Sequence, residues 1–270
     1  MATTTATRGI TANIAYSGRG VERPRYYANA HERDVLDIVS FPMTVRSARG
    51  LNAGLDVEGF LLADAPTQVG DWADAAQIRD IYVAEVEALL RRLTGADAVK
   101  VSPHGILRFS EASGRAGSGN NSHPARFAHI DIADSSAFPM AERGAEGRTY
   151  ARFANYNVWR AISAPPQDVP LALCDARSFA PEDLIVADAI FDEPDGREWG
   201  FEGLLVAHNP AHQWYYYPDM QADEAIVFKS KDSHPTAAHH IPHVAFNDPT
   251  AVNAIPRSSI EMRATCYWWA

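Results

Sequence analysis

The sequence has 270 residues, of which 46% are hydrophobic and 21% are charged, and its formal net charge is −10. This composition is typical of a globular protein with a sizeable core. We expect one domain over residues 1–270, because β-rich domains of this length commonly stay undivided. The acidic balance argues against nucleic-acid binding, which depends on a basic surface.

Composition also excludes other classes of protein. Cys174 and Cys266 are the only cysteines, and their spacing fits neither a disulfide framework nor a zinc ribbon. The sequence contains no run of about 18 apolar residues, so no membrane span is predicted. Residues 1–8 lack the apolar core of a secretion signal, and we expect a disordered tail there and a cytoplasmic protein. The sequence leaves the oligomeric state open.

The first part of the chain mixes extended and helical patterns. Residues 9–60 consist of short extended segments separated by turns. From residue 74 to residue 93 apolar side chains recur at helical spacing, and Gly95 then predicts the end of the helix. Residues 98–101 predict a strand. We therefore expect residues 9–100 to form an N-terminal α/β section.

A polar, glycine-rich segment follows at residues 113–123. It lacks the Gly-Lys-Ser/Thr ending of a phosphate-binding loop, and no strand-to-helix unit surrounds it. We interpret it as a mobile loop. Its position just before His129 makes it a candidate lid.

After residue 127 the sequence is mostly of β type. Alternating apolar and polar residues predict strands at 152–159, 184–190, 214–217, 225–229 and 260–268. A helical section packed on an antiparallel double-stranded barrel accounts for this order. The predicted fold is therefore mainly β with flanking helices, a double-stranded β-helix (jelly-roll, cupin-like) barrel, with residues 101–270 as the barrel.

The triplet His129-Ile130-Asp131 is a candidate metal site. On a strand, residues i and i+2 point to the same face, so His129 and Asp131 can contact one ion. With ten histidines and 34 acidic residues in the chain, about one such triplet is expected by chance. The triplet needs support from elsewhere in the sequence.

That support is a third candidate ligand, His243, in a short apolar segment at residues 241–246. Two imidazoles and one carboxylate on one face of a metal are the ligand set of non-haem Fe(II) oxygenases. The alternatives are that His243 is a structural histidine, or that a rival supplies the third ligand. The rivals are His208, His212, His234, His239 and His240.

Arg257 follows His243 by fourteen residues and opens a further strand pattern. Alternation places Arg257, Ser259, Glu261 and Arg263 on one face of that strand. A guanidinium with a neighbouring hydroxyl matches a carboxylate in charge and geometry. Arg257 could equally form a surface salt bridge, and Arg263 is the alternative candidate for carboxylate binding.

These positions lie within a longer series of ordered motifs between residues 55 and 265. The motifs are Gly59-Phe60, Leu93-Thr94-Gly95-Ala96, His129-Ile130-Asp131, Asn157-Val158-Trp159-Arg160, Pro170-Leu171-Ala172-Leu173-Cys174-Asp175, Trp214-Tyr215-Tyr216, Pro242-His243 and Arg257-x-Ser259-Ile260-Glu261-x-Arg263. Together they resemble a group of Fe(II)/2-oxoglutarate-dependent dioxygenases that includes the fungal gibberellin desaturase and the cephamycin 7α-hydroxylase component.

The resemblance implies that His129, Asp131 and His243 bind Fe(II), and that Arg257 and Ser259 anchor the distal carboxylate of 2-oxoglutarate. It also implies that O2 is a co-substrate, that succinate and CO2 are released, and that an unactivated C–H bond of a small molecule is oxidised. Hydroxylation, desaturation and cyclisation all occur among such enzymes. Further positions match the family, and we interpret them as barrel core and strand ends. They are Asn157, Trp159, Arg160, Trp214 and Tyr216.

Two other functions stay open on the sequence. A hydrolase or isomerase on a cupin-like barrel could use zinc or manganese with the same ligands, and a barrel without catalytic activity could bind a small molecule. A methyltransferase would need a glycine-loop motif that is not visible. Arg108 could contact an anionic substrate group or be a surface charge. The acidic composition favours a cationic or zwitterionic substrate, such as an amino acid or a natural-product intermediate.

Overall fold

The structure is a computed structural model that describes residues 9–115, 121–193 and 195–270. The expected tail, residues 1–8, and the centre of the glycine-rich loop, residues 116–120, lie outside the described residues. The role of that loop as a lid therefore stays a prediction.

The larger of two sheets has nine strands within the described residues, in the order β1-β3-β13-β10-β15-β8-β12-β11-β2. In chain order these strands are β1 (Gly9–Ser17), β2 (Arg25–Tyr27), β3 (Ile38–Ser47), β8 (His129–Ile130), β10 (Leu171–Cys174), β11 (Leu184–Asp192), β12 (Glu198–Val206), β13 (Trp214–Tyr216) and β15 (His243–Ala245). The three strands β1, β2 and β3 come from the predicted N-terminal section and are hydrogen-bonded into this sheet.

The second sheet has seven strands in the described part of the chain, in the order β4-β14-β9-β16-β6-β7, with β5 paired to β16. Their bounds are β4 (Phe60–Asp64), β5 (Ala98–Val101), β6 (Ile106–Phe109), β7 (Asn121–Ser122), β9 (Tyr150–Ala161), β14 (Glu224–Asp232) and β16 (Ser258–Trp269). The predicted strands at 98–101, 152–159, 225–229 and 260–268 are all found here, each at its expected place.

The predicted helix is present in three continuous pieces. α1 (Ala75–Gln77) leads through a π-helical turn (Ile78–Tyr82) into α2 (Val83–Thr94). The Asp74 side chain accepts a hydrogen bond from the Ala76 amide at the start. Gly95 ends α2 in the left-handed conformation, with φ of 67°, which glycine adopts without strain. Short 3-10 turns also occur in the described ranges, at His31–Arg33, Glu111–Ser113, Ala176–Ser178 and Pro181–Asp183.

The sequence interpretation missed a helix, α3 (Asp134–Gly144), in the part expected to be β. Pro139 lies inside it, and proline normally argues against a helix interior. Its buried residues include only the small side chains Ala137 and Ala141, so the segment has no strong apolar stripe. The helix forms because these alanines pack closely against Phe153 and Tyr267.

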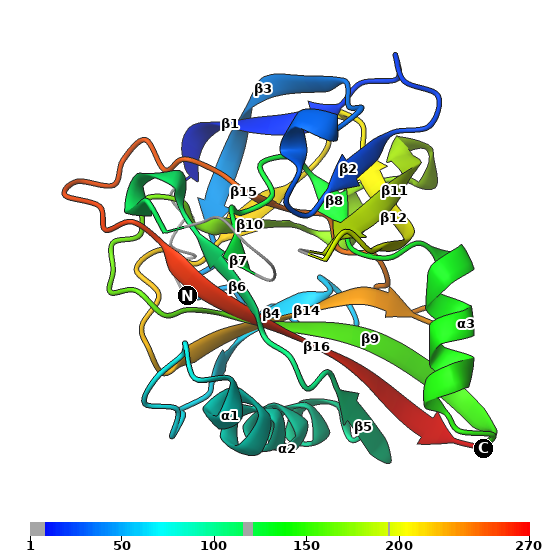
Figure 1. Cartoon of the computed structure of the whole chain (residues 1–270). Coiled ribbons are helices and arrows are strands. Elements are labelled where there is room, and N and C mark those ends of the chain that lie inside the picture. The colour runs from blue at the N-terminus through cyan, green and yellow to red at the C-terminus, as the bar shows by residue number, and fades with distance from the viewer. Residues whose placement is uncertain (1–8, 116–120, 194) are drawn as a thin grey trace, which may run out of the picture.

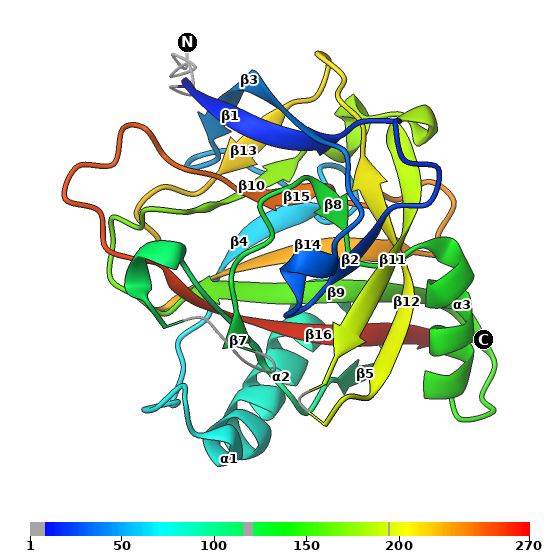
Figure 2. The same ribbon diagram turned by 45° about the horizontal axis from the view of Figure 1, so that its top comes forward.

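The two sheets face each other, and helices α1 and α2 cover the far side of the smaller sheet (Figures 1 and 2). On strands β9 and β16, successive side chains point alternately towards the helices and towards the core between the two sheets. Val158 and Met262 point to the helices and join the core with α2, whereas Trp159 packs in the core between the sheets with Phe60 and Leu173. Two packed sheets of this order agree with the predicted jelly roll.

Candidate functional site

Two neighbouring strands bring two histidines together between the sheets. His129 on β8 pairs directly with His243 on β15. In sequence, His243 lies 112 residues beyond Asp131. Their ring centroids are 4.2 Å apart. Asp131 follows β8 immediately and lies on the same face as His129, as alternation predicts.

The three side chains converge on one point. One ligand atom from each of His129, Asp131 and His243 lies within 4.8 Å of the others, and all three residues are buried. The Asp131 carboxylate oxygens are 3.9 Å from His129 Nε2 and 3.7 Å from His243 Nε2. This is the arrangement of the candidate metal site, with two imidazoles and one carboxylate.

Hydrogen bonding fixes which ring nitrogen of each histidine is available. His129 Nδ1 lies 3.0 Å from the Phe127 carbonyl, and His243 Nδ1 lies 3.1 Å from the Ile241 carbonyl. Because a carbonyl can only accept, each Nδ1 carries the proton and each Nε2 presents a lone pair. Burial lowers the pKa of His129 to about 4 and also lowers the pKa of His243. Both rings are therefore neutral near pH 7, which is the form that binds metals.

The Asp131 carboxylate is held in place by three side chains. Arg263 Nη2 donates to Oδ1 at 2.6 Å, Asn157 Nδ2 donates to Oδ2 at 2.6 Å, and Ser230 Oγ lies 3.3 Å from Oδ2. The single Ser230 hydroxyl proton is closer to Asn157 Oδ1, with the oxygens 2.8 Å apart. Burial would raise the pKa of Asp131, but Arg263 and the two imidazoles bring it well below its usual range. The carboxylate is thus ionised and oriented.

Substitution of Asn157 tests whether its hydrogen bond to Asp131 orients that carboxylate for metal binding. Asn157→Ala is expected to weaken Fe(II) binding by about 10- to 100-fold, because partners that orient a ligand contribute effects of this size. The measurement is Fe(II) titration under anaerobic conditions. Asn155→Ala on the same strand is the matched control, since Asn155 bonds Thr265 instead. Equal iron affinity of the Asn157 variant and the control would contradict this role.

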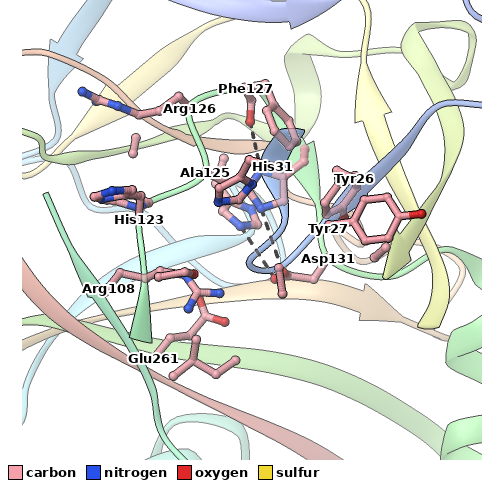
Figure 3. Close-up of a pocket in the computed structure, with 18 of the residues that line it drawn as sticks. Tyr26, Tyr27, His31, Arg108, His123, Ala125, Arg126, Phe127, Asp131 and Glu261 are labelled. Atoms are coloured by element: carbon pink, nitrogen blue, oxygen red, sulfur yellow. Dashed lines mark hydrogen bonds and ion pairs between the residues drawn. The ribbon is translucent and has the colours of Figure 1, made fainter. Parts of the chain in front are cut away.

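The site opens into a cavity of about 330 Å³ that the triad lines together with Arg108, Arg257, Glu261 and Arg263. Figure 3 shows the polar part of this lining around Asp131. Arg257, directly before β16, and Glu261 and Arg263 on β16 all line the cavity, as alternation predicts. Ser259, on the same face, is fully buried and bonds the Arg108 carbonyl at 3.5 Å.

Arg257 is a buried cation whose guanidinium pairs with no carboxylate in the described structure. Its Nη1 donates to the Val169 carbonyl at 2.8 Å, and its Nε has no hydrogen-bond partner. The residue is 2% exposed, so it is not a surface charge. Burial, and then the nearby cations Arg126 and Arg108, lower its pKa. A buried guanidinium with a free donor fits a carboxylate entering the cavity.

Arg263 differs from Arg257 because its carboxylate partners are within the protein. Its Nε donates to Glu261 at 2.9 Å, in addition to the bond from Nη2 to Asp131. Arg108 also lines the cavity and is half-buried, as expected of a residue that contacts an anionic group there. Arg108 has interactions within the protein as well.

The rival histidines have other partners. His212 is bonded to Asp183 at 3.1 Å and to Tyr16, and His240 lies 3.1 Å from Asp134. The remaining three, His208, His234 and His239, contact Phe41, Thr236 and the Ala237 carbonyl respectively. In the residues that the structure describes, His129, Asp131 and His243 form the metal-binding group.

The five family positions interpreted as structural divide into two groups. Asn157 bonds Asp131, and Trp159 packs in the core as interpreted but also lines the cavity, so both residues take part in the site. Arg160 faces the helices, where it bonds Tyr82. Trp214 and Tyr216 pack in the core on the outer face of the larger sheet. For these three residues the structure agrees with the interpretation.

Two contributors were not anticipated. Ser230 lies on β14 between Lys229 and Lys231, where a single serine carries no signal. Tyr26 lines the cavity from β2, and a methyl group at Gly203 would lie 3.0 Å from its hydroxyl oxygen. Glycine at 203 therefore lets the Tyr26 hydroxyl reach the site, a relation that only the sheet order reveals.

Comparison with known proteins connects this geometry to a family. Residues 16–267 match the family described as an oxidoreductase/YMDC permease-like domain. The chain is 31% identical over 200 residues to the Fe(II)/2-oxoglutarate-dependent dioxygenase nvfI of Aspergillus novofumigatus, which covers 72% of this chain and 69% of that protein. It is 30% identical over 246 residues to the hydroxylase/desaturase efuI of Hormonema carpetanum, with 83% and 81% covered.

Solved structures agree in fold. The iron and alpha-ketoglutarate-dependent endoperoxidase NvfI superposes with a TM-score of 0.78 at 23% identity, over 98% of this chain and 100% of that chain. The predicted double-stranded β-helix is thereby confirmed. None of the helices in the described ranges is long and apolar enough to cross a membrane.

Proposed function

The chain belongs to the Fe(II)/2-oxoglutarate-dependent dioxygenases, and on this premise we propose that it oxidises an unactivated C–H bond of a small molecule by hydroxylation, desaturation or cyclisation. The observation that carries the proposal is the buried triad that shares one cavity with the unpaired guanidinium of Arg257. We extend the proposal to the group of the gibberellin desaturase and the cephamycin 7α-hydroxylase component, which the ordered motifs support.

In this proposal His129, Asp131 and His243 bind the iron. Bound Fe(II), with 2-oxoglutarate and O2, supplies the oxidising power that converts 2-oxoglutarate to succinate and CO2 and removes hydrogen from the substrate. The protein presents two neutral Nε2 lone pairs and one ionised carboxylate on one side of the metal. The opposite side is left for the co-substrate and O2.

Arg257, rather than Arg263, is the proposed anchor for the distal carboxylate of 2-oxoglutarate, with Ser259 beside it. Arg263 already neutralises Asp131 and Glu261. Arg257 has a free Nε in a buried position, and its desolvation is offset only when an anion binds. The ring of Trp159, centred 5.4 Å from the Arg257 Cζ, is the aromatic neighbour of this guanidinium.

We further propose that the whole chain forms one catalytic domain in the cytoplasm, with a small molecule and neither nucleic acid nor membrane as partner. The net charge of −10 supports the exclusion of nucleic acid. Both cysteines are free and buried, which fits a reducing compartment.

The direct test is to add Fe(II) and 2-oxoglutarate without O2 and record the visible spectrum. We expect a weak metal-to-ligand charge-transfer band, followed by formation of succinate when O2 is admitted. The control is Zn(II) with 2-oxoglutarate, which should give no band. Turnover of a substrate with zinc or manganese, independent of O2 and 2-oxoglutarate, would instead establish the hydrolase or isomerase.

A further inference from the structure

The cavity has two sides of different character. Figure 3 shows Arg108, His123 and Arg126 on one side of Asp131, with Tyr26 and Tyr27 on the other. Arg257 belongs to the first side, because its carbonyl accepts a hydrogen bond at 2.8 Å from the amide of Ser110, directly after the strand β6 that carries Arg108. If 2-oxoglutarate occupies the basic side, as the proposed function requires, the substrate is left with the other side.

That other side is formed by aromatic rings from the end of the larger sheet. Tyr26 and Tyr27 come from β2, Phe191 from β11 and Phe201 from β12, and all four line the cavity. These strands are neighbours in the order β12-β11-β2, next to β8 of the metal triad. Phe191 and Phe201 stack with centroids 5.5 Å apart. Such a wall favours a molecule with flat apolar rings.

The charges that line the whole cavity balance. Among the described lining residues there are four arginines and four carboxylates, and Fe(II) and 2-oxoglutarate carry equal and opposite charges. Arg126 pairs with Glu111 at 3.0 Å, and Arg263 pairs with Asp131 and Glu261. With Fe(II) and 2-oxoglutarate bound, the charges around the cavity therefore sum to zero, and no net charge attracts an ionic substrate.

On the aromatic side the one carboxylate is already engaged. Asp34 accepts a hydrogen bond from the Tyr27 amide at 2.7 Å and lies 3.6 Å from His31 Nδ1. Tyr26 also lines this side, and its phenol is a neutral group that can donate one hydrogen bond. A carboxylate of a substrate would be buried there without an oppositely charged partner, and an ammonium would meet only Asp34, which already accepts from the Tyr27 amide and lies close to His31.

We propose that the substrate is an uncharged, ring-containing molecule that lies against Tyr26, Tyr27, Phe191 and Phe201. This inference rests on the proposed function, and it replaces the cationic or zwitterionic substrate expected from composition. The net charge of the protein comes from residues outside the cavity. The free-energy cost of burying a charged substrate depends instead on the charges that line the cavity.

Three probes with the same ring system test the charge preference. Naphthalenemethanol is neutral, naphthoate is an anion and naphthylmethylammonium is a cation. Each is titrated by calorimetry into the protein loaded with Fe(II) and 2-oxoglutarate under anaerobic conditions. We expect the neutral probe to bind at least about tenfold more tightly than either ion, because the ions lose hydration without gaining a partner.

Matched phenylalanine variants test the location. Phe201→Ala and, separately, Phe191→Ala should weaken binding of naphthalenemethanol by about tenfold, since each removes an aromatic contact in the cavity. Phe138→Ala is the control, because Phe138 lies on α3, is 41% exposed and does not line the cavity. Thermal melting of each variant verifies that it is folded.

Several results would overturn the inference. These are equal or tighter binding of naphthoate or naphthylmethylammonium, no binding of naphthalenemethanol, and equal affinities of the Phe201, Phe191 and Phe138 variants. The charge-transfer band is measured without any probe. A normal band with the wrong probe preference would therefore reject the substrate class alone, whereas loss of the band would reject the proposed function.

Discussion

His243→Ala is expected to raise the dissociation constant for Fe(II) by more than about 100-fold, because it removes a ligand itself rather than a residue that orients one. The variant also leaves His129 and Asp131 as a pair that cannot hold the metal facially. The charge-transfer band with 2-oxoglutarate should disappear at Fe(II) concentrations that saturate the unmodified protein. Anaerobic titration followed by this band is the measurement.

His212→Ala is the control for this prediction. His212 is also a buried histidine with a carboxylate partner, Asp183, but it lies in a hydrogen-bonded group with Tyr16 away from the triad. Its loss should lower thermal stability and leave iron affinity unchanged. Full iron affinity in the His243 variant, with loss in the His212 variant, would show that the third ligand has been assigned to the wrong histidine.

The sequence was sufficient to predict the fold class and the three residues that meet in the triad. The triplet His129-Ile130-Asp131 has little weight alone, because a chain of this composition contains about one by chance. The triplet became a credible metal site because His243 and then Arg257 follow it in the sequence. Strand alternation predicted the rest, since Arg257, directly before β16, and Glu261 and Arg263 on β16 all line the cavity.

Contacts between distant strands could not be predicted in the same way. Ser230 and Asn157 meet Asp131 because β14 pairs with β9 and both face β8, and no local pattern encodes that meeting. Tyr26 reaches the site because β2 joins the sheet beside β11. The choice between Arg257 and Arg263 depended on which guanidinium already had carboxylate partners, and only the packed structure contains that information.

Arg257→Met should raise the 2-oxoglutarate concentration required for half-maximal turnover by about 100-fold, because a buried charge pair with the co-substrate is lost. Iron binding should be spared, since Arg257 contacts none of the three ligands. The ligand-free variant should be at least as stable as the unmodified protein, because methionine removes a buried cation that lacks a carboxylate partner. Turnover at varied 2-oxoglutarate concentration measures the first effect. Thermal melting with and without 2-oxoglutarate measures the stability of the variant and its stabilisation by the co-substrate.

Two further variants separate charge from geometry at this position. Arg257→Lys keeps the charge but loses the planar fork, so its 2-oxoglutarate requirement should lie between those of the methionine variant and the unmodified protein. Arg263→Met should instead weaken Fe(II) binding, because Arg263 orients Asp131 and neutralises Glu261. An unchanged 2-oxoglutarate requirement in Arg257→Met, together with a raised one in Arg263→Met, would transfer the anchoring role to Arg263. The buried guanidinium of Arg257 would then have to be matched by an anionic group on the substrate, which would also overturn the uncharged substrate inferred from the cavity.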